Sequence, residues 1–369
     1  MKGKIINLPK AVVVLITFVL AVGFLLVLRG GSYIVAYVPT EGYMASLVGE
    51  VIVSIYALIL LLVFGYGRIV KEKGVGFVKG FYVAGFFLGY VGLEVMAMSM
   101  MMAIKKGGAI QPALYILFFV LTMFFIGWAE EIVFRGVILN LLLERFSNSR
   151  GGIIVATVIS SVMFGALHLN NYFAGVKLES ALVQAVQAMA LGLVFAAVYV
   201  RTGNIWIGII MHAAVDFAGL MSSGIFGIGT EIDGINNIST ANLISLPIFL
   251  IPAIVLLRGS KLDEIVRRRN GEVVFETYAE AESAATTSLV VGIIGILAGC
   301  MGMGLGLGLG ITGILGSSIS MKIKKEGNGV AVGGMVTSII SIVMSIFMGI
   351  ILLITYASMD AAMLEMLNY

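Results

Sequence analysis

Apolar segments of about 20 residues recur along the chain, and they limit its fold more than any other feature, because a membrane-spanning helix needs about 20 mostly apolar residues. In the first part of the chain they are expected at residues 11–28, 45–66, 81–104, 112–131, 152–168, 181–200, 205–221 and 243–257. The chain is 60% hydrophobic and 12% charged, whereas soluble domains are about 45–50% apolar and about 25% charged. The sequence therefore predicts an all-α polytopic membrane protein with about eight transmembrane helices in this part.

The basic residues between these segments predict their orientation. Under the positive-inside rule, loops rich in Lys and Arg face the cytoplasm. The basic start, Met1–Lys10, precedes a long apolar segment with no A-x-A-like cleavage site, which favours an uncleaved first helix over a signal peptide. We therefore expect an integral protein of the plasma membrane with a cytoplasmic N-terminus. Alternate loops hold most of the basic residues, namely Arg68, Lys71, Lys73, Lys79, Arg145, Arg150, Arg201, Arg258, Lys261, Arg267, Arg268 and Arg269.

A change of composition after residue 258 predicts a division into domains. We expect a membrane domain at 1–258, a charged cytoplasmic linker at 259–287 and a glycine-rich membrane module at 288–369. In this module the apolar run 289–319 fits either one tilted span or a re-entrant hairpin, and a last span is expected near 330–356. We therefore expect a glycine-rich helical hairpin. Its glycines favour close helix packing, with a filter-like backbone site as the alternative.

The charge and the cysteine content exclude several functional classes. A net charge of +3, scattered along the chain, is too small for a nucleic-acid-binding protein. A single cysteine, Cys300, excludes an intrachain disulfide and a cysteine-rich metal site. Any chemistry that depends on histidine has two candidates, His168 and His212, and both fall within or at the end of predicted spans.

Three ionisable side chains stand close together inside an apolar segment, at Glu130, Glu131 and Arg135. Charges in membrane helices are costly, so they usually face the bundle interior and serve a function. Glu131 and Arg135 are four residues apart on one helix face and can neutralise each other. Glu130 lies about 100° further round the helix, outside this local pairing. The pair is either a structural ion pair or a substrate-positioning element, whereas Glu130 is a candidate catalytic base.

Two further spans carry polar residues at helical spacing, Phe164-x-x-x-His168 and His212-x-x-x-Asp216. Residues four apart project to one side of a helix, so His212 and Asp216 present an imidazole and a carboxylate to one place, to which His168 can add a second imidazole. Phe164 is expected to pack as an apolar ring. The sequence therefore predicts that Glu130, His168, His212 and Asp216 converge in one catalytic site.

The order and spacing of these clusters resemble the CAAX-protease and bacteriocin-processing family, CPBP or Abi, of intramembrane proteases. Its signature is E-E-x-x-x-R, then F-x-x-x-H, then H-x-x-x-N or D. The preceding segment, Arg201-Thr202-Gly203-Asn204-Ile205-Trp206, is also similar to the family's lead-in to its last histidine helix. The resemblance covers about residues 112–217, and the glycine-rich module loosely resembles small two-helix membrane modules of unknown function.

Two mechanisms are open for such a site. In one, a divalent metal ion, with zinc as the first candidate, is bound by some or all of Glu130, His168, His212 and Asp216 and activates a water molecule. In the other, which the resemblance implies, Glu130 and His168 orient the water while His212 and the residue at position 216 stabilise the oxyanion. The related CAAX prenyl proteases carry Asn at that position. An ionised Asp cannot donate a hydrogen bond, so Asp216 is expected to be protonated, to orient His212 or to bind metal.

The resemblance implies an intramembrane endopeptidase that hydrolyses a peptide bond through a water activated by glutamate and histidine, with or without metal. The alternative is a catalytically silent membrane scaffold, or a carrier coupled to protons or ions. The expected partners are a peptide or membrane-protein substrate and the lipid bilayer, with no nucleic acid. Prenylated CAAX tails, bacteriocin leaders and other membrane proteins all remain open as substrates, because specificity depends on pocket shape.

Overall fold

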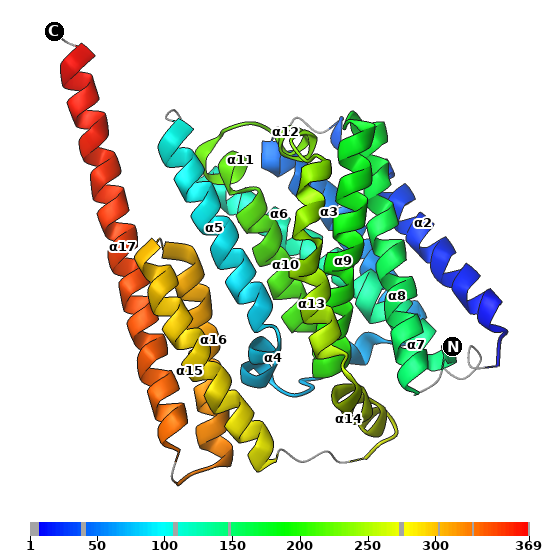
Figure 1. The fold of residues 1–369 in the computed structure, drawn as a ribbon. Coiled ribbons are helices and arrows are strands. Elements are labelled where there is room, and N and C mark those ends of the chain that lie inside the picture. The colour runs from blue at the N-terminus through cyan, green and yellow to red at the C-terminus, as the bar shows by residue number, and fades with distance from the viewer. Residues whose placement is uncertain are drawn as a thin grey trace. The chain divides into compact units, whose positions relative to one another are not determined.

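The computed structural model describes residues 7–37, 42–105, 110–146, 149–272, 277–301, 303–326 and 328–367. Throughout these ranges the regular elements are helices, and no strand is present (Figure 1). Eight helices are long and apolar enough to cross a membrane, or up to ten if each of two bent helix pairs is one span. The prediction of an all-α polytopic membrane fold is therefore confirmed.

Contacts between helices group the chain into two compact units. Unit 1 comprises Met1–Gly80 and Ile110–Val274, and unit 2 comprises Phe81–Ala109 and Phe275–Tyr369. The predicted span at 81–104 was assigned to the first domain, but its helix α5 (Gly85–Lys105) packs on α16 (Met303–Ile323) in unit 2. The glycines explain this preference, because a Cβ atom at Gly92 would overlap the carbonyl oxygen of Gly304.

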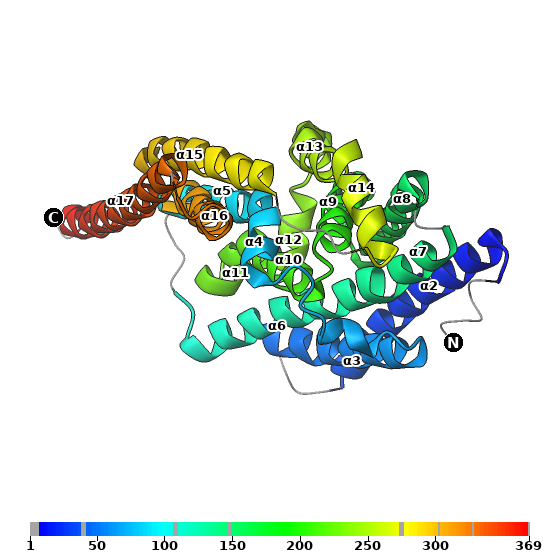
Figure 2. The ribbon, with the colours of Figure 1, turned by 90° about the horizontal axis from the view of Figure 1, so that it is seen from below.

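Five of the predicted spans recur in unit 1 as helices long enough to cross a membrane alone, whereas the span at 243–257 is one arm of a bent pair and the span at 205–221 is a shorter apolar helix. Helix α2 packs on α3, α3 on α6, and α6 on α10, while α8 and α13 both pack on α9. The view from below shows α2, α3 and α6 along one edge (Figure 2). Their bounds are α2 (Lys10–Val35), α3 (Gly42–Val63), α6 (Ala113–Glu131), α7 (Asn140–Phe146), α8 (Arg150–Leu167), α9 (Leu178–Thr202), α10 (Ile205–Gly219), α13 (Leu246–Leu256) and α14 (Gly259–Arg269). Shorter segments complete the unit, namely η1 (Gly67–Val70), α4 (Phe77–Val83), which continues into unit 2, η2 (Ile132–Leu139), η3 (His168–Ala174), α11 (Met221–Phe226), α12 (Glu231–Asn236) and η4 (Thr240–Ser245).

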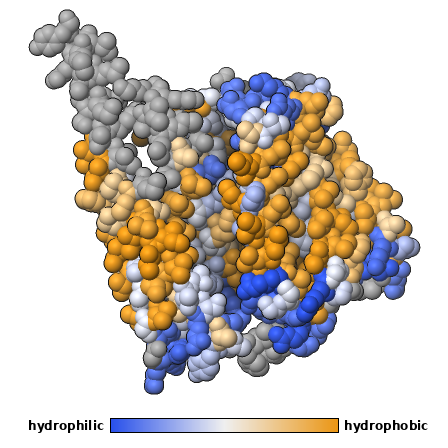
Figure 3. All heavy atoms as spheres, viewed as in Figure 1, coloured by the Kyte–Doolittle hydropathy of each residue, from blue (hydrophilic) through white to orange (hydrophobic). Residues whose placement is uncertain are grey.

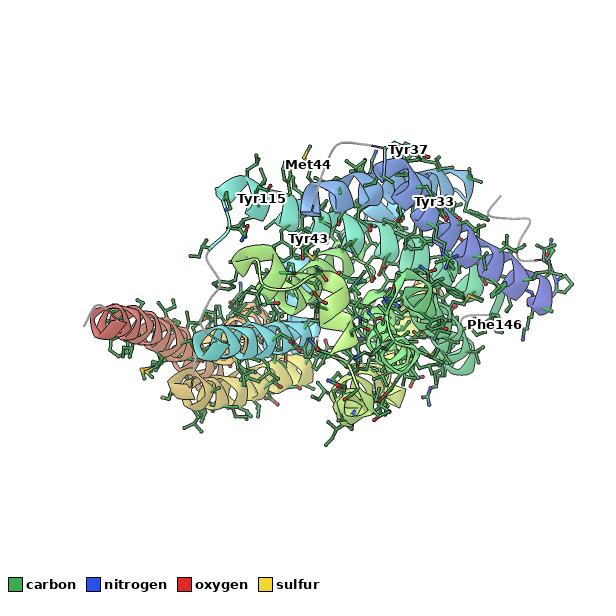
Figure 4. All side chains as sticks on the ribbon, turned by 90° about the horizontal axis from the view of Figure 1, so that it is seen from above. Tyr33, Tyr37, Tyr43, Met44, Tyr115 and Phe146 are labelled. Atoms are coloured by element: carbon green, nitrogen blue, oxygen red, sulfur yellow. The ribbon has the colours of Figure 1, made fainter. Side chains whose placement is uncertain are left out.

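The surface of unit 1 suits a bilayer. On the face shown, apolar side chains cover the middle of α8, α9 and α13, and hydrophilic residues lie toward the ends (Figure 3). Val158 on α8 and Ile254 on α13 are examples of exposed apolar side chains. Tyr33 and Tyr37, near the end of α2, are 75% and 91% exposed (Figure 4). Aromatic side chains favour the membrane–water interface, so this end of α2 is placed to lie at one.

The turn between α9 and α10 is fixed by its sequence. Gly203 has a φ of +62°, a left-handed conformation that favours glycine. Asn204 then caps α10, its Oδ1 accepting from Trp206 N at 3.0 Å, while its Nδ2 donates to Lys73 O at 3.2 Å. Gly74 approaches so closely that a Cβ atom there would overlap the Thr202 carbonyl oxygen. These contacts fix the start of the helix that carries His212.

The glycine-rich region of unit 2 forms three helices. The run 289–319 is divided between α15 (Tyr278–Met301) and α16, in line with the two-helix alternative for this run, and α17 (Gly329–Leu367) covers the expected last span. The Ala- and Glu-containing residues 278–287, assigned to the linker, are good helix formers and extend α15. Glycines meet serines where these helices pack, as Gly295 does with Ser341. This agrees with the prediction of close helix packing.

Candidate active site

A buried ion pair lies at the point where α6 changes into the π-helix η2. The Arg135 guanidinium donates from Nη1 to Glu131 Oε1 at 2.8 Å and from Nη2 to the carbonyl oxygen of Gly192, on α9, at 3.0 Å. Both charged side chains are at most 1% exposed. The guanidinium also lies 4.5 Å from the ring centroid of Phe164, which allows a cation–π interaction. The pair is therefore enclosed by α8, α9 and η2.

The same carboxylate connects this pair to His212. Glu131 Oε1 lies 2.8 Å from His212 Nδ1, so an ionised Glu131 accepts the hydrogen of Nδ1 and leaves Nε2 directed away from the pair. The imidazole stacks on Phe195, with ring centroids 4.7 Å apart. Arg135, Glu131 and His212 thus form one continuous chain of contacts. A carboxylate that holds one imidazole nitrogen is a common way to fix the tautomer and orientation of a catalytic histidine.

Two further carboxyl groups face the second nitrogen of this imidazole. Glu130 Oε2 lies 3.4 Å and Asp216 Oδ2 lies 3.6 Å from His212 Nε2. Their side chains are 19% and 25% exposed, whereas the His212 side chain is 4% exposed. Three carboxyl groups therefore surround one imidazole, and the two that face Nε2 belong to partly exposed side chains, although Asp216 Oδ2 itself is buried.

His168 lies at the end of α8 and is half-buried. Its Nδ1 lies 3.3 Å from the carbonyl oxygen of Phe164. A carbonyl can only accept, so Nδ1 carries the hydrogen in this contact and Nε2 keeps its lone pair in the neutral ring. Both imidazoles pack on Phe164, with centroid distances of 5.3 Å to His168 and 5.8 Å to His212. The ring of Phe164 thus lies between the two histidines.

The structure brings the predicted site residues to one region of unit 1. Glu130, His212 and Asp216 meet directly, and Phe164 joins His168 to them. The sequence reasoning offered Glu131 as a structural or substrate-positioning residue, and its contact with the His212 imidazole was not foreseen. Two other neighbours were missed: Phe195, which stacks on His212, and Gly192, whose carbonyl holds Arg135. Neither carries a signal in the sequence, because one is a ring in an apolar helix and the other contributes only backbone.

The same groups are the metal ligands that the sequence offers, namely Glu130, His168, His212 and Asp216. Within the described ranges, no set of three or more His, Cys, Asp or Glu side chains has a geometry that could hold a metal ion. The contacts of His212 Nδ1 with Glu131 and of His168 Nδ1 with a carbonyl leave Nε2 of each ring as the nitrogen that a metal ion would use. The zinc ion considered from the sequence therefore stays a prediction.

Gly208 provides a test of this packing. A Cβ atom at that position would lie 2.9 Å from Glu131 Oε2, and Glu131 cannot retreat freely because Arg135 and His212 hold it. We expect Gly208→Ala to lower the free energy of unfolding by about 1–3 kcal/mol, as overpacking does, and to reduce turnover. Gly219→Ala, on the same helix with open space around it, is the control and should be neutral or stabilising. Equal behaviour of the two variants in unfolding experiments would contradict this packing.

Residues 112–218, which contain the whole constellation, match the family model of type II CAAX prenyl endopeptidase Rce1-like proteins. The chain carries a domain of this family. No curated protein matches the chain. The family match agrees with the CPBP resemblance and supports an endopeptidase in a membrane environment. The Rce1-like domain covers under a third of the chain, from the start of α6 to the end of α10.

Proposed function

We propose that the chain is an intramembrane endopeptidase in which Glu130 activates a water molecule for attack on a peptide carbonyl of a membrane-associated substrate. The observation that carries the proposal is the meeting of Glu130 and Asp216 at His212 Nε2, within 3.4 and 3.6 Å. These groups belong to the Rce1-like domain, and the side chains of Glu130 and Asp216 are partly exposed.

The proposed reaction has two steps. First, Glu130 takes a proton from water, assisted by the lone pair of His168 Nε2, as the water oxygen bonds to the substrate carbonyl carbon. The resulting oxyanion accepts hydrogen bonds from a protonated His212 Nε2 and a protonated Asp216 carboxyl group. Second, the carbon–nitrogen bond breaks, and Glu130 returns its proton to the leaving amine. The products are a new carboxyl terminus and a new amino terminus.

The spacing around His212 explains why protons are needed at both oxyanion donors. Glu131 accepts from Nδ1, so a neutral imidazole would turn a bare Nε2 lone pair toward the oxygens of Glu130 and Asp216. A lone pair and two ionised carboxylates repel one another. A proton on Nε2 and one on the Asp216 carboxyl group remove this repulsion. The proton on Asp216 also provides a hydrogen-bond donor for the oxyanion, which the related prenyl proteases obtain from the amide of Asn at that position.

A hydrolysis assay in isotopic water tests the proposal. Purified full-length protein in lipid nanodiscs is incubated in H₂¹⁸O with three peptides: a prenylated CAAX peptide, the same peptide without the prenyl group, and a transmembrane peptide. The expected result is cleavage of at least one membrane-associated peptide, with ¹⁸O in the new carboxyl terminus by mass spectrometry and loss of this product in His168→Ala. No ¹⁸O-labelled product from any of the three would overturn the proposal. Proton or ion flux in proteoliposomes without cleavage would instead favour a carrier.

A further inference from the structure

The π-helix η2 is an unusual element on which to build a buried ion pair. Residues Ile132–Leu139 form π-type turns between the regular helices α6 and α7, and all eight are buried. π-helices are rare and often occur at functional sites. Where a π-helix joins an α-helix, the regular pattern of backbone hydrogen bonds is interrupted, yet every buried backbone carbonyl needs a donor. The groups that donate to the carbonyls of η2 therefore help to hold its residues at their positions around the helix axis.

Side chains supply donors to three consecutive carbonyls of η2. Ser160 Oγ, on α8, donates to Phe134 O at 3.1 Å. The side-chain amide of Asn140 donates to Arg135 O at 3.1 Å and to Gly136 O at 2.9 Å. The backbone amide of Asn140 bonds instead to Val137 O, three residues earlier. The side chain of Asn140 thus reaches the carbonyls that its own backbone amide does not.

Asn140 is itself held from α9. Its Nδ2 also lies 2.8 Å from Tyr199 Oη. The amide has two hydrogens for three acceptors, so the carbonyls of Arg135 and Gly136 share one of them. The same helix provides Gly192 O for the Arg135 guanidinium and Phe195 for the His212 ring. Arg135 is consequently fixed at both ends, its carbonyl by Asn140 and its guanidinium by Glu131 and Gly192. A shift of η2 by one residue would carry Arg135 about 100° round the helix axis, away from Glu131.

We infer that Asn140 is a positioning residue, whose side-chain amide keeps η2 in the register that places Arg135 against Glu131 and so orients His212. It acts through these groups and does not contact the reacting atoms. The kinetic part of the inference rests on the proposed function, since it assumes that His212 stabilises the oxyanion. The structural part does not, because the orientation of His212 can be measured without a substrate.

Asn140→Leu is the direct test, since leucine has a similar size and no hydrogen-bond donor. Asn140 and Tyr199 border a pocket of about 260 Å³, which gives the new side chain room. We expect kcat to fall by about ten- to a hundredfold, because small misplacements of catalytic groups have effects of that size, while KM changes by less than about twofold. Asn328→Leu, in unit 2, is the matched control. It removes side-chain bonds to Lys324 O at 3.1 Å and Ser320 Oγ at 3.0 Å, and kcat should stay at the wild-type value.

The second readout is the imidazole of His212. The chain has two histidines, so ¹⁵N-histidine labelling gives two ring spin systems, which His168→Asn assigns. We expect Asn140→Leu to shift the His212 ring nitrogens and Asn328→Leu to leave them unchanged. If Asn140→Leu does not fold, Tyr199→Phe decides, with an expected smaller shift and smaller loss of kcat. A normal kcat, or a loss of kcat with unchanged His212 signals, would overturn the inference.

The two readouts separate the inference from the proposed function. If wild-type protein cleaves no peptide but Asn140→Leu still shifts the His212 signals, the proposed function fails and the positioning role of Asn140 stands. If wild-type protein cleaves peptide and Asn140→Leu changes neither kcat nor the signals, the positioning role fails and the proposed function stands.

Discussion

Glu130→Gln is expected to lower kcat by about 10²–10⁴-fold, the usual contribution of a general base. The amide keeps the shape of the side chain but cannot take a proton from water. Because the amide oxygen can still accept a hydrogen bond from a protonated His212 Nε2, 3.4 Å away from the present carboxylate oxygen, the variant should fold normally. The measurement is single-turnover cleavage of the peptide identified in the nanodisc assay, together with thermal unfolding.

The control for this variant is Glu94→Gln, which removes another carboxyl group from an apolar helix. Glu94 lies on α5 in unit 2, outside the Rce1-like domain. Its variant is expected to cleave at the wild-type rate. Full activity of Glu130→Gln would remove the base from the proposed mechanism, and a similar loss in both variants would point to a general effect on the membrane fold instead.

The helices of unit 1 could be predicted from the sequence because their length and apolar character are properties of continuous segments. The predicted spans 152–168 and 181–200 correspond to α8 (Arg150–Leu167) and α9 (Leu178–Thr202). The association of α5 with α16 could not be predicted in this way. It depends on which glycines of two distant segments face each other, as Gly92 and Gly304 do, and apolar character alone does not distinguish one lipid-facing surface from another.

Within the candidate site, spacing indicated which residues could meet but not which atoms do. His212 and Asp216 were expected on one helix face, and the structure places them there, 3.6 Å apart. The i to i+4 rule also paired Glu131 with Arg135. It could not show that Glu131 has a second partner on α10, since this depends on the crossing of α6 and α10 at Gly127 and Gly208, where small residues allow close approach. The π-helix was also missed, because the hydrophobic pattern of 132–139 does not differ visibly from that of an α-helix.

Arg135→Met is expected to be the most destabilising of these substitutions. The Glu131 carboxyl group is fully buried, and Arg135→Met removes its permanent cation and leaves the titratable His212 imidazole to compensate its charge. Breaking a buried ion pair from one side costs about 3–5 kcal/mol of folding free energy. The double variant Glu131→Gln with Arg135→Met removes both charges and should recover most of that loss, since replacing a whole buried pair by uncharged groups is often neutral or stabilising.

Stability and activity should separate in this double variant. The amide introduced by Glu131→Gln would lack the negative charge that holds the hydrogen of His212 Nδ1, so kcat should remain low even where the unfolding free energy recovers. The surface pair Arg150–Asp263, whose side chains are 58% and 46% exposed, provides the control. Exposed ion pairs contribute little to stability, so Arg150→Met should leave both the unfolding free energy and kcat nearly unchanged. Unfolding and turnover of the variants are measured in the same detergent.

A double variant as unstable as Arg135→Met alone would show that charge compensation is not what Arg135 provides. A double variant that regains full turnover would show that Glu131 does not act through His212.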